Sequence, residues 1–411
     1  MSTMSFAEFA LDPRLLSNLQ QLGYTQPTPI QQQAIAPILA GRDLLAGAQT
    51  GTGKTAAFVL PILQRLLTTA AAATTPVRAL VLVPTRELAL QVHQSVERYG
   101  AGTGLRAALV YGGVSIAAQA EVLQAGVELV IATPGRLLDH LRQGVVSLSG
   151  VEVLVLDEAD RMLDMGFADE INALLAQLPV ARQTLLFSAT FNDGVYQLAK
   201  SRLRDPLRIE VAPRNSAAGE IEQRVYVVDS ERKAELVSHL IQVSGYRPVL
   251  IFSRTRQGCD QLAKALAARQ IGARALHGDL SQSAREQVLQ DFRDGSLQAL
   301  VATDVAARGL DIPELDYVLN LELPFQPEDY VHRIGRTGRA GRNGLAITLF
   351  SVDDSLLLEE LESLLDRRLP QQWFPGFEPD LTRSAPAPRR HGKAAEKQRA
   401  KKRAFGSKGK R

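Results

Sequence analysis

The hydrophobic residues of this chain are gathered in short runs that recur along most of its length. Each run is followed by a polar or glycine-containing loop and then by a longer stretch with helical periodicity. Strands that alternate with helices in this way predict an α/β fold, in which parallel sheets are covered on both faces. Eight runs are predicted strands: residues 79–83, 129–132, 153–156, 184–187, 249–252, 299–302, 317–320 and 346–350.

The pattern weakens in two places, and these divide the chain into domains. Residues 204–223 contain prolines and small polar residues without a sustained period, so we place a linker within them, at 209–219. Beyond residue 370 the sequence lacks the apolar content to pack, which predicts a disordered tail. The predicted parts are an N-terminal segment (1–32), a first domain (33–208), the linker (209–219), a second domain (220–370) and the tail (371–411).

Charge distinguishes the end of the tail from the rest of the chain. Residues 381–411 hold twelve of the 47 Lys and Arg residues but one of the 44 acidic residues, a net charge of +11. The other residues carry a net charge of −8. A polyanion is therefore the expected partner of the tail, with a solubilising role as the alternative. Its basic residues include Arg389, Arg390, Arg399, Lys401, Lys402 and Arg403.

Composition excludes several other classes of protein. The single cysteine, Cys259, allows no intramolecular disulfide, and six scattered histidines offer no metal-ligand spacing. We expect Cys259 to be a small buried residue rather than a catalytic thiol. No apolar run approaches the roughly 18 residues that a membrane helix needs, and the first residues do not resemble a targeting signal. A cytoplasmic protein without a membrane partner is expected.

Polar clusters follow six of the predicted strands directly. In chain order they are "PTREL", "TPGR", "DEAD", "SAT", "SRT" and "TDVAARGLD". Because ligands of open parallel sheets bind at the carboxyl ends of the strands, we expect these clusters to lie on the ligand-binding edges.

The segment "AQTGTGKT", residues 48–55, has the properties of a phosphate-binding loop before a helix. Gly51 and Gly53 let backbone N–H groups turn toward phosphate oxygens, and the helix start adds positive charge. Lys54 can reach the terminal phosphates, and the Thr55 hydroxyl can ligate Mg²⁺. Ala48 departs from the strict G-x-x-x-x-G-K-[ST] pattern, and a glycine-rich turn without a ligand is the alternative. The loop predicts a nucleoside triphosphatase.

Two further motifs fit a nucleotide site. In "DEAD" (157–160), Asp157 can hold Mg²⁺, often through water, and Glu158 can orient or deprotonate the attacking water. A helix cap is the alternative for this cluster. In "GYTQPTPIQ" (23–31), the Gln31 amide matches the hydrogen-bonding edge of adenine, and Phe6 is a candidate to stack on the base. A proline-rich turn before a helix is the alternative there.

With these motifs in order, the chain resembles the DEAD-box RNA helicases of superfamily 2 over about residues 6–370. The matching segments also include "GG" (112–113), "VLIFSRT", "HGDLSQSAR" and "HRIGRTGR" (332–339). Ala48 is the usual residue of this family's phosphate loop. The segments "VAPRNSAA" and "FPGFEPD" are further similar to the bacterial RhlE-like branch. The resemblance implies two RecA-like parallel-sheet domains joined by a flexible linker.

The resemblance also implies a role for each matching residue. Arg336 and Arg339 would be arginine fingers on the γ-phosphate of ATP, and Asp311 would approach the ribose. Ser188, Thr190 and His332 would couple ATP hydrolysis to strand separation. The implied nucleotide contacts are Phe6, Tyr24, Gln31, Ala48, Gln49, Thr50, Gly51, Thr52, Gly53, Lys54, Thr55, Gly309, Asp311, Arg336 and Arg339. The implied RNA-backbone contacts are Pro84, Thr85, Arg86, Gly113, Thr133, Arg136, Arg254 and Thr303.

The expected activity is RNA-stimulated ATP hydrolysis that closes two lobes and unwinds short RNA duplexes without processive travel. Its cofactors would be ATP and Mg²⁺, and ribosome-assembly or RNA-decay proteins are candidate partners. An ATP-dependent RNA clamp or assembly scaffold uses the same residues and stays an alternative. A DNA translocase and a small-molecule kinase fit the full set of motifs less well.

Overall fold

The computed structural model describes residues 4–47, 52–68, 77–211, 221–307, 315–338 and 344–380. The chain divides into two compact units, whose described parts are residues 4–211 and 221–380 apart from the gaps given above. Each unit contains a seven-stranded sheet in which every strand pairing is parallel. The α/β prediction with two parallel-sheet domains is confirmed.

The sheet of the first unit has the strand order β3-β4-β2-β5-β6-β1-β7. Its strands are β1 (Leu44–Gly47), β2 (Ala79–Leu82), β3 (Ala107–Val110), β4 (Leu129–Ala132), β5 (Val153–Leu156), β6 (Gln183–Ser188) and β7 (Leu207–Glu210). Its helices are the 3-10 helix η1 (Phe6–Phe9), then α1 (Pro13–Gln21), α2 (Pro29–Leu39), α3 (Lys54–Thr68), α4 (Arg86–Tyr99), α5 (Ile116–Gln124), α6 (Pro134–Arg142), α7 (Ala159–Asp164), α8 (Ala168–Leu175) and α9 (Asp193–Arg202).

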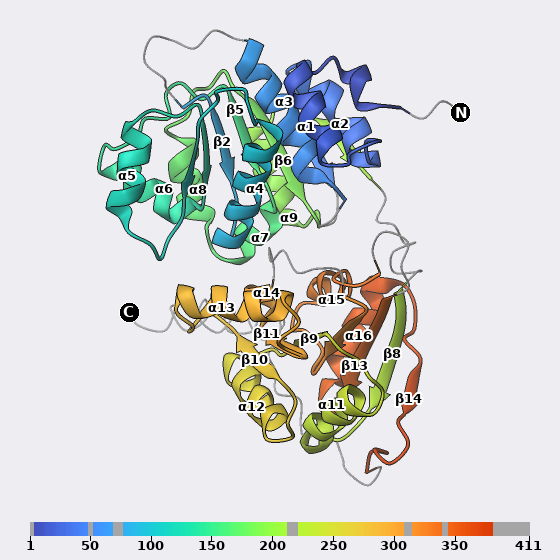
Figure 1. Ribbon diagram of the computed structural model, residues 1–411. Coiled ribbons are helices and arrows are strands. Elements are labelled where there is room, and N and C mark those ends of the chain that lie inside the picture. The colour runs from blue at the N-terminus through green and yellow to red at the C-terminus, as the bar shows by residue number, and fades with distance from the viewer. Residues whose placement is uncertain are drawn as a thin grey trace, which may run out of the picture. The chain divides into compact units, whose positions relative to one another are not determined.

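Alternate residues of each central strand enter different hydrophobic cores of this unit. On β5, Val153 and Val155 pack with residues of α1 to α4, while Leu154 and Leu156 pack with residues of α6 to α9. Burial on both faces explains why the central strands are continuous apolar runs rather than alternating ones. Figure 1 shows the helices on the two faces of the sheet.

The second unit has the strand order β10-β11-β9-β12-β13-β8-β14. Its strands are β8 (Ile221–Val227), β9 (Val249–Phe252), β10 (Ala273–Leu276), β11 (Ala299–Ala302), β12 (Tyr317–Asn320), β13 (Gly344–Phe350) and β14 (Gln371–Trp373). Its helices are α11 (Lys233–Gln242), α12 (Arg256–Ala267), α13 (Gln282–Arg293), α14 (Asp304–Ala307), α15 (Pro327–Ile334) and α16 (Ser355–Leu365), with the 3-10 helices η2 (Ser230–Arg232) and η3 (Val352–Asp354). Cys259 is buried in α12, as expected.

All eight predicted strands exist, with ends that differ by at most two residues. The sequence pattern missed strands near the sheet edges, where one face or one end is polar. In β7 only Ile209 is buried, so this strand has no apolar run to detect. It lies within residues 204–223, for which the sequence predicted no regular structure. Of the predicted linker, residues 212–219 lie outside the described residues.

The predicted disorder from residue 371 onward is wrong for residues 371–380. Strand β14 pairs in parallel with β8, and Phe377 is buried. The Phe374 ring lies 5.2 Å from that of Tyr226, and the Arg232 guanidinium lies 4.7 Å from the Phe377 ring centroid. A few aromatic residues pack this segment against the second unit, although its average composition is typical of a disordered tail. Residues 381–411 lie outside the described residues.

We predict that Phe377→Ala destabilises the second unit by about 3 kcal/mol, the usual cost of removing a buried phenyl ring. Trp373→Ala is the control, since that ring is 57% exposed and its loss is expected to cost less than about 0.5 kcal/mol. Urea unfolding followed by circular dichroism measures both values. Equal midpoints for the two variants would contradict the packing of Phe377.

Candidate functional site

Three loops of the first unit meet at the carboxyl edge of neighbouring strands. They follow β1, β5 and β6, which are adjacent in the sheet in the order β5-β6-β1. These loops carry Lys54 at the start of α3, the "DEAD" residues, and Ser188 with Thr190. The structure therefore brings Lys54 to two motifs that lie more than 100 positions later in the sequence.

Lys54 is a buried cation, and within the part of the chain that the structure describes its ammonium group has no hydrogen-bond partner. Its Nζ lies 3.9 Å from Oδ1 of Asp157, which is also buried. A buried charge that is poorly paired is costly unless a ligand compensates it. Lys54 therefore has the environment expected of a residue that binds an anion.

Burial raises the pKa of Asp157 to about 6, although the nearby Lys54 ammonium lowers it. The backbone N–H of Glu158 donates to Asp157 Oδ1 at 2.9 Å and fixes this carboxylate. Glu158 itself has a left-handed backbone, with φ of 52°. For a residue other than glycine this conformation is strained and is often found at functional sites.

Asp160 connects the "DEAD" loop to the "SAT" loop. Its Oδ2 accepts hydrogen bonds from the backbone N–H and the hydroxyl of Thr190, at 2.9 and 2.8 Å. The Ser188 hydroxyl donates to the carbonyl of Thr190 at 2.7 Å, and the backbone N–H of Asp160 donates to the Ser188 hydroxyl at 3.3 Å. The two predicted coupling residues are thus hydrogen-bonded to the acidic loop. The role of Asp160 was missed, because only the fold brings it to Thr190.

Gln31 lies against the phosphate loop rather than free in solvent. Its Nε2 donates to the carbonyl of Gly53 at 3.1 Å, and its Oε1 accepts from the backbone N–H of Thr28 at 2.9 Å. The Thr28 hydroxyl donates to the carbonyl of Thr52 at 2.8 Å. One N–H and one lone pair of the Gln31 amide remain for a base. Sequence analysis missed Thr28, although the Thr-x-x-Gln spacing of a capping box indicates it.

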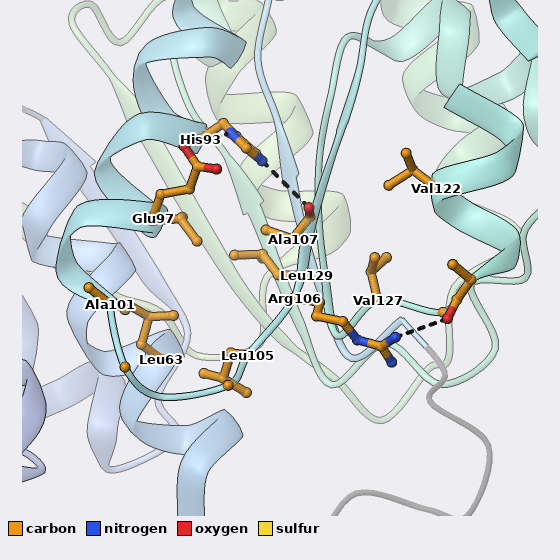
Figure 2. Close-up of a pocket in the computed structure, with 16 residues that line it drawn as sticks. Leu63, His93, Glu97, Ala101, Leu105, Arg106, Ala107, Val122, Val127 and Leu129 are labelled. Atoms are coloured by element: carbon orange, nitrogen blue, oxygen red, sulfur yellow. Dashed lines mark hydrogen bonds and ion pairs between the residues drawn. The ribbon is translucent and has the colours of Figure 1, made fainter. Parts of the chain in front are cut away.

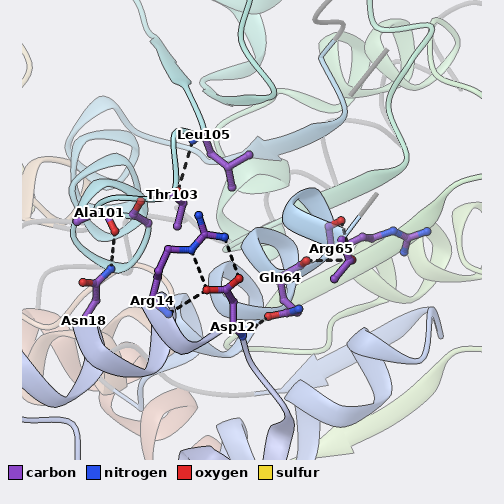
Figure 3. A network of polar contacts seen from close by, with 10 residues as sticks. Asp12, Arg14, Asn18, Gln64, Arg65, Ala101, Thr103 and Leu105 are labelled. Atoms are coloured by element: carbon purple, nitrogen blue, oxygen red, sulfur yellow. Dashed lines mark hydrogen bonds and ion pairs between the residues drawn. The ribbon is translucent and has the colours of Figure 1, made fainter. Parts of the chain in front are cut away.

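Aromatic contacts and a network of polar contacts attach the N-terminal segment to this unit, and Figure 3 shows the polar network. Phe6 is buried in the core and meets Tyr24 edge to face, so it leaves little ring surface for a base. The Asp12 backbone N–H donates to Gln64 Oε1 at 2.5 Å, and the Asn18 amide donates to the carbonyl of Ala101 at 2.9 Å. The Arg14 side chain, which hydrogen-bonds Asp12, lowers the pKa of that carboxyl to about 2.

The predicted RNA contacts of the first unit gather at the carboxyl ends of β2, β3 and β4, which are neighbours in the sheet. Pro84 and Thr85 follow β2, and Thr85 is the N-cap of α4. The Arg86 guanidinium lies so close to Gly113 that a Cβ there would come within 2.8 Å of it. Thr133 caps α6, and Nη1 of Arg136 donates to the carbonyl of Val114 at 2.9 Å.

In the second unit Arg254 follows β9 and Thr303 follows β11, its neighbour in the sheet. The Arg254 guanidinium hydrogen-bonds Asp354, whose other oxygen lies 3.4 Å from the Lys233 ammonium. Burial lowers the pKa of Lys233, while the Asp354 charge opposes that shift. Arg254 is therefore already paired with a carboxylate in this structure.

One arginine of "HRIGRTGR" has a structural role that sequence analysis missed. Arg333 is almost completely buried and pairs with both carboxylate oxygens of Asp304, at 2.5 and 2.7 Å. It also donates to the carbonyl of Glu322 at 2.7 Å. His332 lies on the same helix, α15, and the largely buried Arg336 follows its end. Seven predicted site residues lie outside the described residues: Ala48, Gln49, Thr50, Gly51, Gly309, Asp311 and Arg339.

Comparison with known proteins identifies the family. The model of DEAD/DEAH box helicases matches residues 28–198, and that of the helicase conserved C-terminal domain matches residues 232–341. A DEAD-box ATP-dependent RNA helicase of Helicobacter pylori, RhpA, is 43% identical over 84% of this chain and 69% of its own length. The chain belongs to the DEAD-box family of ATP-dependent RNA helicases. It is accordingly an RNA-dependent ATPase, and the family prediction is confirmed.

Other relatives agree with this assignment. CshA of Listeria monocytogenes, an ATP-dependent RNA helicase, is 42% identical over 89% of this chain and 69% of its own length. Dbp5 of S. cerevisiae bound to RNA and ADP BeF3 is similar in structure, with a TM-score of 0.80 and 32% identity over 90% of this chain and 95% of that chain. Assignment to the RhlE-like branch stays a prediction.

A cavity of about 480 Å³ lies at a different edge of the first unit (Figure 2). It is lined by the end of α4, the glycine-containing loop that follows, and the first residues of β3 and β4. It therefore opens at the amino ends of these strands, whereas the helicase motifs follow the carboxyl ends. In the described part of the chain, no helix is long and apolar enough to cross a bilayer.

We predict that Gly53→Ala weakens ATP binding at least about tenfold. Gly53 has φ of +89°, and an added Cβ would lie 2.5 Å from Nε2 of Gln31. Backbone strain alone costs about 1–3 kcal/mol, and 1.4 kcal/mol is tenfold in affinity. Titration with a fluorescent ATP analogue measures the change. Gly135→Ala is the control, since nothing lies within 4 Å of the added Cβ. Equal affinities for both variants would argue against a tightly packed phosphate loop.

Proposed function

We propose that this helicase assembles its catalytic site from both units and uses that closure to separate short RNA duplexes locally. The observation that carries the proposal is the buried Lys54 ammonium, which lies 3.9 Å from Asp157 and has no hydrogen-bond partner among the described residues. This half-site could hold a triphosphate, but we propose that Lys54 alone does not neutralise the charge that develops on the transferred phosphoryl group. Arg336 and Arg339 of the second unit would supply the further cations.

The residues of the first unit fit ATP with Mg²⁺. Lys54 would neutralise the terminal phosphates, and Thr55 with Asp157 would hold the metal, partly through water. The described residues contain no cluster of three or more His, Cys, Asp or Glu that could hold a metal by itself. That is consistent with Mg²⁺, which usually takes few carboxylates and is completed by phosphates and water. Mg²⁺ supplies charge neutralisation when bound, and Glu158 orients the attacking water.

Gln31 would link adenine recognition to the phosphate loop. Its amide is already hydrogen-bonded to Thr28 and Gly53, so a base that uses the remaining N–H and lone pair also stabilises the loop. Tyr24 is 38% exposed and Phe6 is 5% exposed. Tyr24 is therefore the better candidate for contact with the base, and Phe6 would hold the Tyr24 ring in position through their edge-to-face contact.

Arg333 would keep the finger residues in position. Its bidentate pair with Asp304 joins α15 to the loop after β11, where Thr303 lies. If RNA binding moved the loop that carries Thr303, α15 and the following Arg336 would therefore move with it. On the first unit, the hydrogen bonds between Asp160 and Thr190 would transmit the state of the nucleotide to the "SAT" loop.

RNA would bind across the carboxyl edges of both sheets through its sugar–phosphate backbone. The predicted contacts are glycines, threonines and arginines, which suit phosphates and 2′-hydroxyls rather than base edges. Binding by these residues would be independent of sequence. The basic residues of 381–411 would tether RNA further and increase the salt sensitivity of binding. We also propose that the protein is cytoplasmic and that its protein partners act in ribosome assembly or RNA decay.

An RNA clamp that uses ATP only to lock onto its strand is the second candidate. The ion pair of Arg254 with Asp354 holds this predicted RNA contact in place in the structure, as a clamp would require. Strand displacement separates the two candidates, because a clamp binds tightly without releasing the second strand.

We predict that the protein with ATP and Mg²⁺ displaces a strand from duplexes of about one helical turn and loses this activity well before about 40 pairs. Arg339→Ala is expected to lower RNA-stimulated ATP hydrolysis about 10³- to 10⁵-fold, as loss of an arginine finger does. Native gel electrophoresis and a phosphate-release assay measure the two effects. Undiminished unwinding at 40 pairs would contradict local separation, and normal turnover of the variant would contradict assembly of the site.

We also predict that affinity for ATP with Mg²⁺ falls as the pH drops through 6. Burial raises the pKa of Asp157 to about 6, and only the ionised carboxylate holds the cation. Above pH 6 the carboxylate is charged. Below it the ionised fraction falls about tenfold per pH unit. Asp157→Asn is the control, since its remaining pH dependence reports the titration of ATP itself. If the affinities of both proteins changed with pH in parallel between pH 5 and 8, Asp157 would not be a metal ligand.

A further inference from the structure

The second unit exposes an aromatic ring beside a predicted RNA contact. Phe325 is 48% exposed and lies in the loop between β12 and α15. Strand β12 neighbours β9, whose carboxyl end leads to Arg254, and β9 neighbours β11, which leads to Thr303. Phe325 therefore lies at the same edge of the sheet as the two predicted backbone contacts of this unit.

A cation lies close to the Phe325 ring. The Arg254 guanidinium carbon is 5.1 Å from the ring centroid, within the range of a cation–π contact. Asp354 hydrogen-bonds the same guanidinium, and Glu322 Oε2 accepts from the Arg254 backbone N–H at 3.1 Å. Arg254 is thus fixed from two sides, and its charge stays next to the ring.

The loop that carries Phe325 is stiff. Pro324 precedes the ring and is buried, and Pro327 begins α15. Proline fixes its own φ angle, so the backbone on either side has few alternatives. The carbonyl of Glu322 also accepts a hydrogen bond from the buried Arg333 at 2.7 Å. A large apolar ring that is rigidly held and half exposed to water is already ordered for a flat partner.

We propose that Phe325, with Arg254, forms a stacking platform for one unpaired base of the bound RNA strand. The proposal rests on the proposed function, since it requires that RNA crosses this edge. The other predicted contacts reach phosphates and sugars, so Phe325 adds a contact to a base. A phenyl ring has no hydrogen-bonding groups, and the platform would therefore accept any base. It would favour unpaired strands, because a paired base is covered by its neighbours in the stack.

The experiment is an abasic scan of single-stranded RNA. Fluorescein-labelled RNA of about 12 nucleotides, within the site sizes of single-strand binders, is titrated with the full chain and a non-hydrolysable ATP analogue. A set of RNAs that lack one base each at successive positions is compared with the intact strand. The variants are Phe325→Ala, Phe325→Leu and Phe325→Tyr. Trp373→Ala is the control for loss of another exposed aromatic ring, and circular dichroism confirms that each variant is folded.

With the wild-type protein, removal of a base at one or two adjacent positions is expected to weaken binding about 5- to 150-fold. Phe325→Ala and Phe325→Leu should weaken binding of the intact RNA by a similar factor and abolish the sensitivity to the missing base. Phe325→Tyr should retain both, and Trp373→Ala should match the wild type. The salt dependence should stay unchanged, since no phosphate contact is lost.

Two results would overturn the platform. In one, Phe325→Ala shows the same affinity and the same scan as the wild type. In the other, it weakens all RNAs equally, as expected if the ring contacts protein instead of a base. Failure of the wild-type protein to bind RNA at all would instead refute the proposed function, and the platform with it.

Discussion

The chemistry of this protein depends on one poorly paired buried charge. The Lys54 ammonium is removed from water at the start of α3, and its nearest carboxylate, Asp157, is too far for a hydrogen bond. A charge in this position destabilises the unit until an anion enters. In the proposed function, binding of a triphosphate would therefore remove an electrostatic penalty that folding created. The same burial raises the pKa of Asp157 and makes its carboxylate a better acceptor for a cation.

Several cations of the second unit are, in contrast, closely paired with carboxylates. Arg333 has two hydrogen bonds to Asp304 and another to the carbonyl of Glu322, and Lys233 and Arg254 share Asp354. These paired charges fix the loops after β9, β11 and β12. Lys54 is only poorly paired with Asp157, whereas Arg333, Lys233 and Arg254 each pair closely with a carboxylate. This difference fits the proposed function, in which the first unit would bind the nucleotide and the second would present arginines held by carboxylates.

How far the sequence predicts this molecule differs between its parts. Central strands such as β5 and β9 are found from sequence because they are buried on both faces and are apolar throughout. Strands β7 and β14 escape detection, since an edge strand needs only one buried side chain or a few aromatic contacts. Lys54, Asp157 and Glu158 are predicted site residues from their motifs, because phosphate and metal binding restrict the residue types at a fixed spacing. Thr28, Asp160 and Arg333 are not assigned a role, because each acts on a residue that is distant in sequence.

The sequence by itself determined the α/β class and the family and predicted the residues of the nucleotide site, since periodicity and short motifs are local properties. The tertiary structure decided which of those residues are free to bind and which are already paired. Gln31 is engaged with the phosphate loop, Phe6 is packed in the core, and Arg254 is shared between Asp354 and an exposed phenyl ring. Burial and partner choice depend on which strands become neighbours in the sheet, and no local pattern contains that information.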